Sequence, residues 1–121
     1  MKKKALVIED DGNNLLLEKD LLVAAGFEVF EAGNGSDGIS IARKEKLDII
    51  IMDIRLPDMF GTKAANILSQ DKETCGIPIV FVTASLLTES RASIEAVIKR
   101  GLIVKPINTR TFVKEISQFI K

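Results

Sequence analysis

The chain has 121 residues, of which 46% are hydrophobic, and this is an ordinary size for one domain with a single buried core. Lys plus Arg and Asp plus Glu both total 17, so no bulk charge favours nucleic acid or an anionic membrane as a partner. A lone cysteine, Cys75, and the absence of His exclude a disulfide framework and the common zinc spacings, and they suit a reducing cytoplasm.

The first apolar segment, residues 4–8, predicts a strand. Three acids, Glu9, Asp10 and Asp11, follow after only four consecutive apolar residues, which is too short for the core of a signal peptide. No stretch of the chain approaches the roughly 18 uninterrupted apolar residues of a membrane span, so we expect no membrane partner.

A helix is expected next, with Asn13 as its cap and Gly26 as its stop. The positions that recur there at helical spacing are Leu15, Leu16, Lys19, Leu22 and Val23. A short strand follows over residues 27–31. The turn at residues 34–36 caps a second helix that ends near Glu45 and faces inward through Ile39, Ile41 and Ala42.

The third strand, residues 48–52, is apolar at consecutive positions, which is typical of a central strand covered by helices on both faces. A loop at 56–58, a helix over 62–69 and a polar connection over 71–76 lead to a fourth strand that enters at Pro78. Helical spacing then predicts a helix over 88–99 and a last helix after Asn108. Between them, the short apolar run at 102–104 predicts a fifth strand. The last helix carries Phe112, Val113, Ile116, Phe119 and Ile120.

Strand and helix therefore alternate five times, which predicts an α/β fold with a doubly wound, five-stranded parallel sheet of order 2-1-3-4-5, as in flavodoxin. We expect one domain over residues 1–121, with nothing left for an output domain. In this topology the carboxyl ends of the strands meet at one edge, where open α/β sheets bind ligands.

That edge collects acids from two neighbouring strands. Glu9 and Asp10 follow the first strand and Asp53 follows the third, and adjacent strands lie about 4.8 Å apart. Two unit charges about 5 Å apart repel by roughly 3 kcal/mol at an effective dielectric near 20, so three ionised carboxylates require a cation. Hard oxygen ligands beside a phosphoryl group favour Mg²⁺. Taken alone, the acidic run also fits a solvated loop.

Asp53 ends the most buried strand, where an isolated carboxylate would be costly without a compensating cation. A carboxylate can act as a nucleophile toward phosphorus, although an aspartate here can also be a simple loop or cap residue. Thr83 and Lys105 end the fourth and fifth strands and would supply a hydroxyl and an ammonium to the transferred charge. Together these residues indicate phosphoryl transfer.

Four motifs closely resemble the receiver domain of two-component response regulators, the CheY-like fold, over the whole chain. They are VIEDD at 7–11, IMDIRLPDMFG at 51–61, VTA at 82–84 and VKP at 104–106. The resemblance implies that Asp53 accepts a phosphoryl group from a sensor histidine kinase or a histidine phosphotransfer protein. It also implies that Glu9, Asp10, Asp53 and the backbone carbonyl of Arg55 hold Mg²⁺, with Asp11 outside the ligand set. Thr83 and Lys105 would contact the phosphoryl group.

The resemblance further implies a cis bond between Lys105 and Pro106. The protein would then be a signalling phosphoacceptor and not an enzyme in its own right. It would dock its phosphoryl donor on the first helix and an unknown target on the face formed by the fourth helix, fifth strand and fifth helix. No direct contact with nucleic acid is implied.

One position departs from the family pattern. Leu102 stands where receivers carry Tyr or Phe, and the usual Gly-Ala pair before it is replaced by residues 97–101. We expect Leu102 to be packed in the core instead of acting as a rotamer switch. Phosphorylation can still shift a population of conformations without an aromatic switch, and we expect that change to concentrate in residues 84–105.

Three alternatives remain to be weighed against a working receiver. A pseudo-receiver that acts as a phosphate-independent interaction module is favoured by Leu102 and disfavoured by the complete set of site residues. A hydrolase of the haloacid dehalogenase type would carry an acid two residues after its nucleophile, and this chain has Arg55 there. A flavodoxin-like flavin binder would need a Ser/Thr/Gly-rich phosphate loop after the first strand, which is absent.

Overall fold

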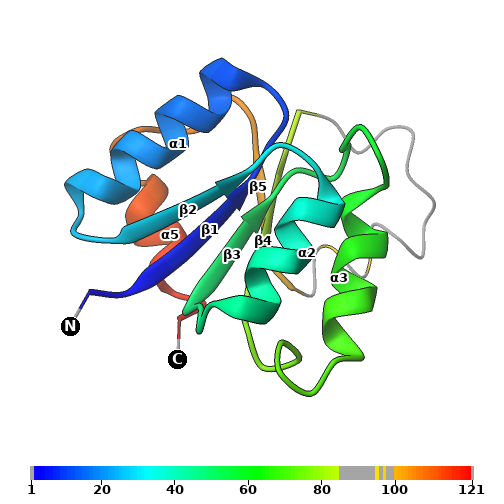
Figure 1. Cartoon of the computed structure of the whole chain (residues 1–121). Coiled ribbons are helices and arrows are strands. Elements are labelled where there is room, and N and C mark those ends of the chain that lie inside the picture. Colours follow the sequence, from blue (N-terminus) through cyan, green and yellow to red (C-terminus); the bar gives the residue numbers. More distant parts are fainter. Residues whose placement is uncertain (1, 85–94, 96, 98–99, 121) are drawn as a thin grey trace.

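A computed structural model describes residues 2–84, 95, 97 and 100–120, and it confirms the predicted α/β sheet (Figure 1). Five parallel strands lie in the order β2-β1-β3-β4-β5. The strands are β1 (Lys4–Ile8), β2 (Glu28–Ala32), β3 (Ile49–Met52), β4 (Ile79–Thr83) and β5 (Leu102–Val104). The described helices are α1 (Gly12–Ala24), α2 (Gly35–Lys44), α3 (Gly61–Ser69) and α5 (Phe112–Ser117). The helix predicted over residues 88–99 lies outside the described residues, except for positions 95 and 97.

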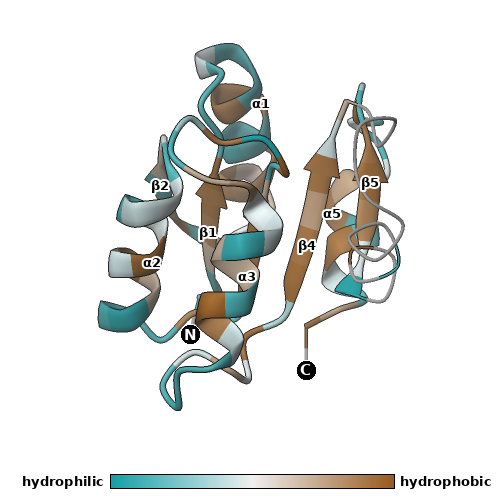
Figure 2. Cartoon of the chain, turned by 90° about the vertical axis from the view of Figure 1, so that its right-hand side faces the viewer, coloured by the Kyte–Doolittle hydropathy of each residue, from teal (hydrophilic) through white to brown (hydrophobic). Residues whose placement is uncertain are grey.

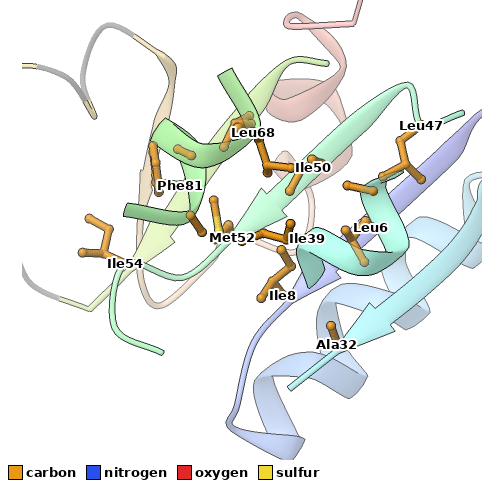
Figure 3. Packing of buried hydrophobic residues seen from close by; sticks show 14 of the residues in the cluster. Leu6, Ile8, Ala32, Ile39, Leu47, Ile50, Met52, Ile54, Leu68 and Phe81 are labelled. Atoms are coloured by element: carbon orange, nitrogen blue, oxygen red, sulfur yellow. The ribbon is translucent and has the colours of Figure 1, made fainter. Parts of the chain in front are cut away.

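Helices cover both faces of the sheet, α1 and α5 on one side and α2 and α3 on the other (Figure 1). The hydropathy view shows strands β4 and β5 as strongly hydrophobic, whereas the helices also carry hydrophilic residues (Figure 2). Each face has its own apolar core. The core beneath α2 and α3 includes Leu6, Ile8, Ile39, Ile50, Met52, Leu68 and Phe81 (Figure 3). The core beneath α1 and α5 includes Val7, Leu22, Ile51, Val82, Phe112 and Ile116.

The middle strand, β3, is buried at all four of its residues, as its unbroken apolar sequence predicts. Alternate side chains supply the two cores, Ile49 and Ile51 on one face and Ile50 and Met52 on the other. Full burial of one such side chain contributes about 1.5 to 3 kcal/mol, so β3 is firmly held on both of its faces. The residue that follows it, Asp53, therefore starts from a fixed position.

Strand register brings the carboxyl ends of four strands to one edge. Ile8 pairs with Met52, and Met52 pairs with Phe81. On the outer side Thr83 pairs with Val104. The ladder continues past the strands, because the Asp53 N–H donates to the carbonyl of Ile8 at 3.0 Å.

Two details of α1 differ from the sequence prediction. Its cap is Asp11 and not Asn13: the Asp11 Oδ1 atom accepts from the N–H groups of Asn13 at 2.9 Å and Asn14 at 3.2 Å. A carboxylate suits this end, because it satisfies unpaired N–H groups and favours the positive end of the helix dipole. The predicted stop at Gly26 is confirmed by its φ of 94°.

The buried side of α1 was also predicted wrongly in part. Leu16 and Val23 are exposed, and the side that packs inward carries Leu15, Glu18 and Leu22. These three positions follow the i, i+3, i+7 spacing of one helical face. The sequence prediction assigned apolar residues to the core and therefore missed a buried glutamate among them.

At the other end of the chain, α5 stops at Ser117, before the predicted Phe119 and Ile120. The peptide bond between Lys105 and Pro106 is cis, as the resemblance implied. Leu102 is half-buried and packs against the core under α2 and α3, in agreement with its expected packing role. In the described part of the chain, none of the helices combines the length and hydropathy that a bilayer crossing requires.

Candidate functional site

The acids predicted from β1 and β3 lie together at the carboxyl edge of the sheet. Glu9, Asp10 and Asp53 each offer one carboxylate oxygen to a group whose atoms all lie within 4.8 Å of one another. Glu9 is buried, Asp53 is half-buried and Asp10 is exposed. The burial of Glu9 follows from β1, whose carboxyl end continues the ladder through the Glu9 N–H to the Ala32 carbonyl at 3.0 Å.

Lys105 joins two of these acids. Its ammonium donates to the Oδ2 atom of Asp53 at 3.0 Å and forms a second hydrogen bond with the Oε1 atom of Glu9. The residues come from three separate segments, 52 and 96 positions apart in sequence. Such charge-assisted hydrogen bonds are about twice as strong as neutral ones. The ammonium is thus shared by the predicted nucleophile and one predicted metal ligand.

Burial and charge shift the pKa values of this pair. Burial raises the pKa of Glu9 to about 7, an effect that the Lys105 hydrogen bond opposes and the Asp53 charge reinforces. Burial alone would lower the pKa of Lys105, but its hydrogen bonds to Glu9 and Asp53 outweigh it and raise that pKa above the ordinary value. Lys105 therefore stays protonated at neutral pH.

Thr83 and Arg55 complete the predicted set. Thr83 is the buried last residue of β4, and its carbonyl accepts from the Lys105 N–H at 2.8 Å. The Arg55 N–H donates to the Oδ1 atom of Asp53 at 3.2 Å, which keeps the backbone of Arg55 beside that carboxylate. A backbone hydrogen bond thus holds Lys105 beside Thr83, and a backbone-to-carboxylate hydrogen bond holds Arg55 beside Asp53.

The donor set fits a hard divalent cation. Three carboxylates carry up to three negative charges and Lys105 carries one positive charge, so the fully ionised group has two negative charges in excess. Oxygen donors from a few carboxylates, with room for water on the exposed Asp10 side, are the ligands that Mg²⁺ prefers. Soft sulfur or imidazole ligands are absent from the group.

A fourth acid, Glu18, lies close to this group and was not predicted. Its side chain comes from α1 and is 3% exposed. Burial, and secondarily the charge of Glu9, raise the pKa of Glu18 to about 8. Within the described residues its carboxyl group has no hydrogen bond or ion pair. In the sequence Glu18 stands at helical spacing between Leu15 and Leu22, a pattern that does not by itself mark a charged residue as buried.

The chain matches a known protein family over most of its length. Residues 5–117 match the family model described as the response regulator receiver domain. The chain is 32% identical over 120 residues to the polar-differentiation response regulator DivK of Brucella anthropi, covering 99% of this chain and 98% of that protein. It is 31% identical to the DivK protein of Brucella ovis over the same length.

Solved structures give the same result for the fold. The chemotaxis response regulator CheY4 of Vibrio cholerae superimposes with a TM-score of 0.88 at 27% identity, covering 99% of this chain and 100% of that chain. The receiver domain of a sensor histidine kinase from Pseudomonas aeruginosa, solved with a magnesium ion coordinated in its active site cleft, has a TM-score of 0.85 over 98% of both chains. At 23% identity, this second likeness bears on the fold alone.

Proposed function

The chain belongs to the response regulator receiver family, and we propose that it accepts a phosphoryl group on Asp53 from a phosphohistidine of a sensor kinase or phosphotransfer protein. Residues 1–121 would act as one receiver unit. The phosphorylated form would then signal by binding another protein, as a phosphoacceptor and not as an enzyme that turns over a separate substrate.

In the proposed reaction an Asp53 carboxylate oxygen attacks the phosphorus of the phosphohistidine, on the side opposite to the phosphorus–nitrogen bond. A bond forms between this oxygen and phosphorus, the bond between phosphorus and the imidazole nitrogen breaks, and the imidazole leaves with the electron pair of that bond. The product is a mixed anhydride on Asp53. The attacking group is a carboxylate, and the Lys105 ammonium lies 3.0 Å from its Oδ2 atom.

Lys105 and Thr83 would receive the transferred group. Negative charge spreads over three phosphoryl oxygens in the transition state, and fixed donors around them supply much of the catalysis. Lys105 already donates to Asp53 at 3.0 Å and to Glu9, and its remaining N–H can extend to one of these oxygens. Thr83 ends the neighbouring strand β4 and would supply its hydroxyl to another.

The proposed cation is Mg²⁺, held by Glu9, Asp10, Asp53 and the backbone carbonyl of Arg55. When bound, Mg²⁺ would neutralise charge on the phosphoryl oxygens and on the clustered carboxylates. One observation carries the proposal: three carboxylates, one of them the half-buried Asp53, meet the Lys105 ammonium, and these groups come from three separate segments of the chain.

The proposed partners follow from the same chemistry. The donor would be a protein phosphohistidine, and the target would bind the face that includes β5 and α5. A cytoplasmic site of action is proposed, because the exposed free thiol of Cys75 suits a reducing compartment. Nothing in the balanced charge of the chain supports a direct nucleic-acid partner.

The test is incubation with acetyl phosphate and Mg²⁺, read by intact mass. Wild type should gain the mass of one phosphoryl group, and Asp53→Asn should gain none. Asp48→Asn is a matched control, because this acid lies at the opposite end of β3 and its carboxylate accepts from the Lys4 N–H at 2.7 Å. Undiminished phosphoryl incorporation in Asp53→Asn would refute the assignment of the nucleophile.

A phosphate-independent pseudo-receiver is the second candidate, and Leu102 is the observation that favours it. Its side chain packs against the core under α2 and α3, so no aromatic rotamer is available at this position to report on the phosphoryl group. The same mass measurement separates the two candidates, since a pseudo-receiver would leave wild type unmodified with Mg²⁺ present.

A further inference from the structure

The connection between β3 and α3 is a compact turn. Arg55 and Phe60 pair as an antiparallel bridge, and the Leu56 N–H donates to the Met59 carbonyl at 3.3 Å. The base of the turn is closed by the Gly61 N–H, which donates to the Ile54 carbonyl at 2.6 Å. These internal bonds connect the tip of the turn to its base, so a contact at the tip can help to fix the position of the base.

The tip of this turn is bonded to a different helix. Asp58 accepts two hydrogen bonds from the amino end of α2, from the Gly35 N–H to Oδ1 at 2.8 Å and from the Ser36 N–H to Oδ2 at 2.9 Å. These bonds lower the pKa of Asp58, so the carboxylate is ionised throughout the neutral range. An anion at this end of a helix also interacts favourably with the helix dipole.

The turn and α2 also approach closely through apolar atoms. A Cβ atom at Gly35 would lie 2.6 Å from the Met59 Cγ atom, a distance that side-chain packing does not tolerate. A larger residue at position 35 would therefore force the flexible Met59 side chain to move from its place against α2. Figure 1 shows α2 and α3 side by side on this face of the sheet.

These bonds exceed what α2 needs for its own cap. The Asn34 Oδ1 atom already accepts from the Asp37 N–H at 2.8 Å, which is the usual capping bond. Asp58 instead links two segments 22 and 23 positions apart in sequence. The base of the linked turn is beside the site, where the Arg55 N–H contacts Asp53 at 3.2 Å.

We propose that Asp58 is a positioning residue for the cation site, holding the turn against α2 so that the Arg55 carbonyl is kept in place beside Glu9, Asp10 and Asp53. This inference rests on the proposed function, because it assumes that the Arg55 carbonyl is a ligand. Loss of partners that orient metal ligands lowers metal affinity by roughly 10- to 100-fold. Asp58 acts on Arg55 indirectly, through the internal bonds of the turn, so we expect a loss near the lower end of this range, about 10-fold.

The experiment measures Mg²⁺ binding to the full chain by isothermal titration calorimetry, in wild type, Asp58→Ala, Asp58→Asn and the control Asn34→Ala. Asp58→Ala removes both bonds to α2, and Asp58→Asn keeps one acceptor oxygen. Asn34→Ala removes two hydrogen bonds at the same helix end, both with Asp37, without touching the turn. Urea unfolding of each variant reports the accompanying loss of stability.

The expected order of the Mg²⁺ dissociation constants is wild type and Asn34→Ala together, then Asp58→Asn, then Asp58→Ala. Equal constants for Asp58→Ala and wild type would overturn the inference. So would equal increases in Asp58→Ala and Asn34→Ala, because the effect would then come from a weaker α2 alone. A wild type that does not bind Mg²⁺ would instead overturn the proposed function, together with this inference.

Discussion

The buried carboxyl of Glu18 should make the stability of the protein fall as pH rises through neutrality. Its pKa is about 8 in the folded protein because of burial, whereas an unfolded chain has the ordinary value of 4.5. Between these values the folded state holds a proton that the unfolded state releases. The free energy of unfolding therefore decreases with increasing pH in this window and levels off above pH 8.

The magnitude follows from the two pKa values. Their difference corresponds to at most roughly 5 kcal/mol, at about 1.4 kcal/mol per pH unit. Glu9 has the same sign, but its folded pKa of about 7 means that most of its effect is complete by pH 7. Between pH 7 and 8 we therefore expect wild type to lose about 1 kcal/mol through Glu18, and Glu18→Gln to lose much less.

The assay is urea unfolding followed by circular dichroism, because the chain has no Trp or Tyr to report by fluorescence. A chelator is included so that divalent ions do not alter the charge of Glu9. Asp20→Asn is the matched control, since Asp20 is an exposed acid on the same helix. Parallel pH profiles for wild type and Glu18→Gln between pH 6 and 8.5 would refute the account of Glu18.

Three further predictions test other parts of the structure. Lys105→Ala should slow phosphorylation by acetyl phosphate about 100-fold, because it removes a charged donor next to Asp53. The control Lys114→Ala, on the exposed side of α5, should leave the rate unchanged. An equal rate in both variants would contradict the role of Lys105. Gly61→Ala should destabilise the protein by roughly 1 to 3 kcal/mol in urea unfolding, because its Cβ would lie 2.3 Å from the Asp53 carbonyl oxygen, and Gly76→Ala, with open space around it, is the control. Asp11→Ala should cost about 1 kcal/mol by the same measurement and Asn13→Ala much less, since Asp11 is the cap of α1; the reverse order would restore the original prediction.

The order of elements and the edge that carries the site could be predicted because both follow from local signals. Consecutive apolar residues in 49–52 mark a strand buried on two faces, and an active side chain directly after a strand must lie at the carboxyl edge of a parallel sheet. The cap of α1 was less certain, because Asp11 and Asn13 are both good capping residues and differ by only two positions.

Glu18 and Asp58 could not be predicted for a different reason. The burial of Glu18 depends on how α1 is rotated against the sheet, and a pattern of apolar residues cannot reveal a charged residue that occupies the inward face. The bonds of Asp58 join segments that no sequence spacing relates, since they depend on where α2 lies beside α3. Both features arise from packing between elements.

The position of Lys105 indicates how the site could be read without an aromatic residue at position 102. In the present structure its ammonium is shared by Glu9 and Asp53. If Asp53 carries a phosphoryl group, one of its oxygens becomes part of the anhydride and is a weaker acceptor, so the strongest acceptors near Lys105 become the phosphoryl oxygens and Glu9. Lys105 directly follows β5, a three-residue edge strand, and its N–H donates to the Thr83 carbonyl of β4. A shift of Lys105 would therefore act on β5. A short strand at the sheet edge has few backbone bonds to hold it, so among the described strands we expect β5 to respond most readily to the new charge.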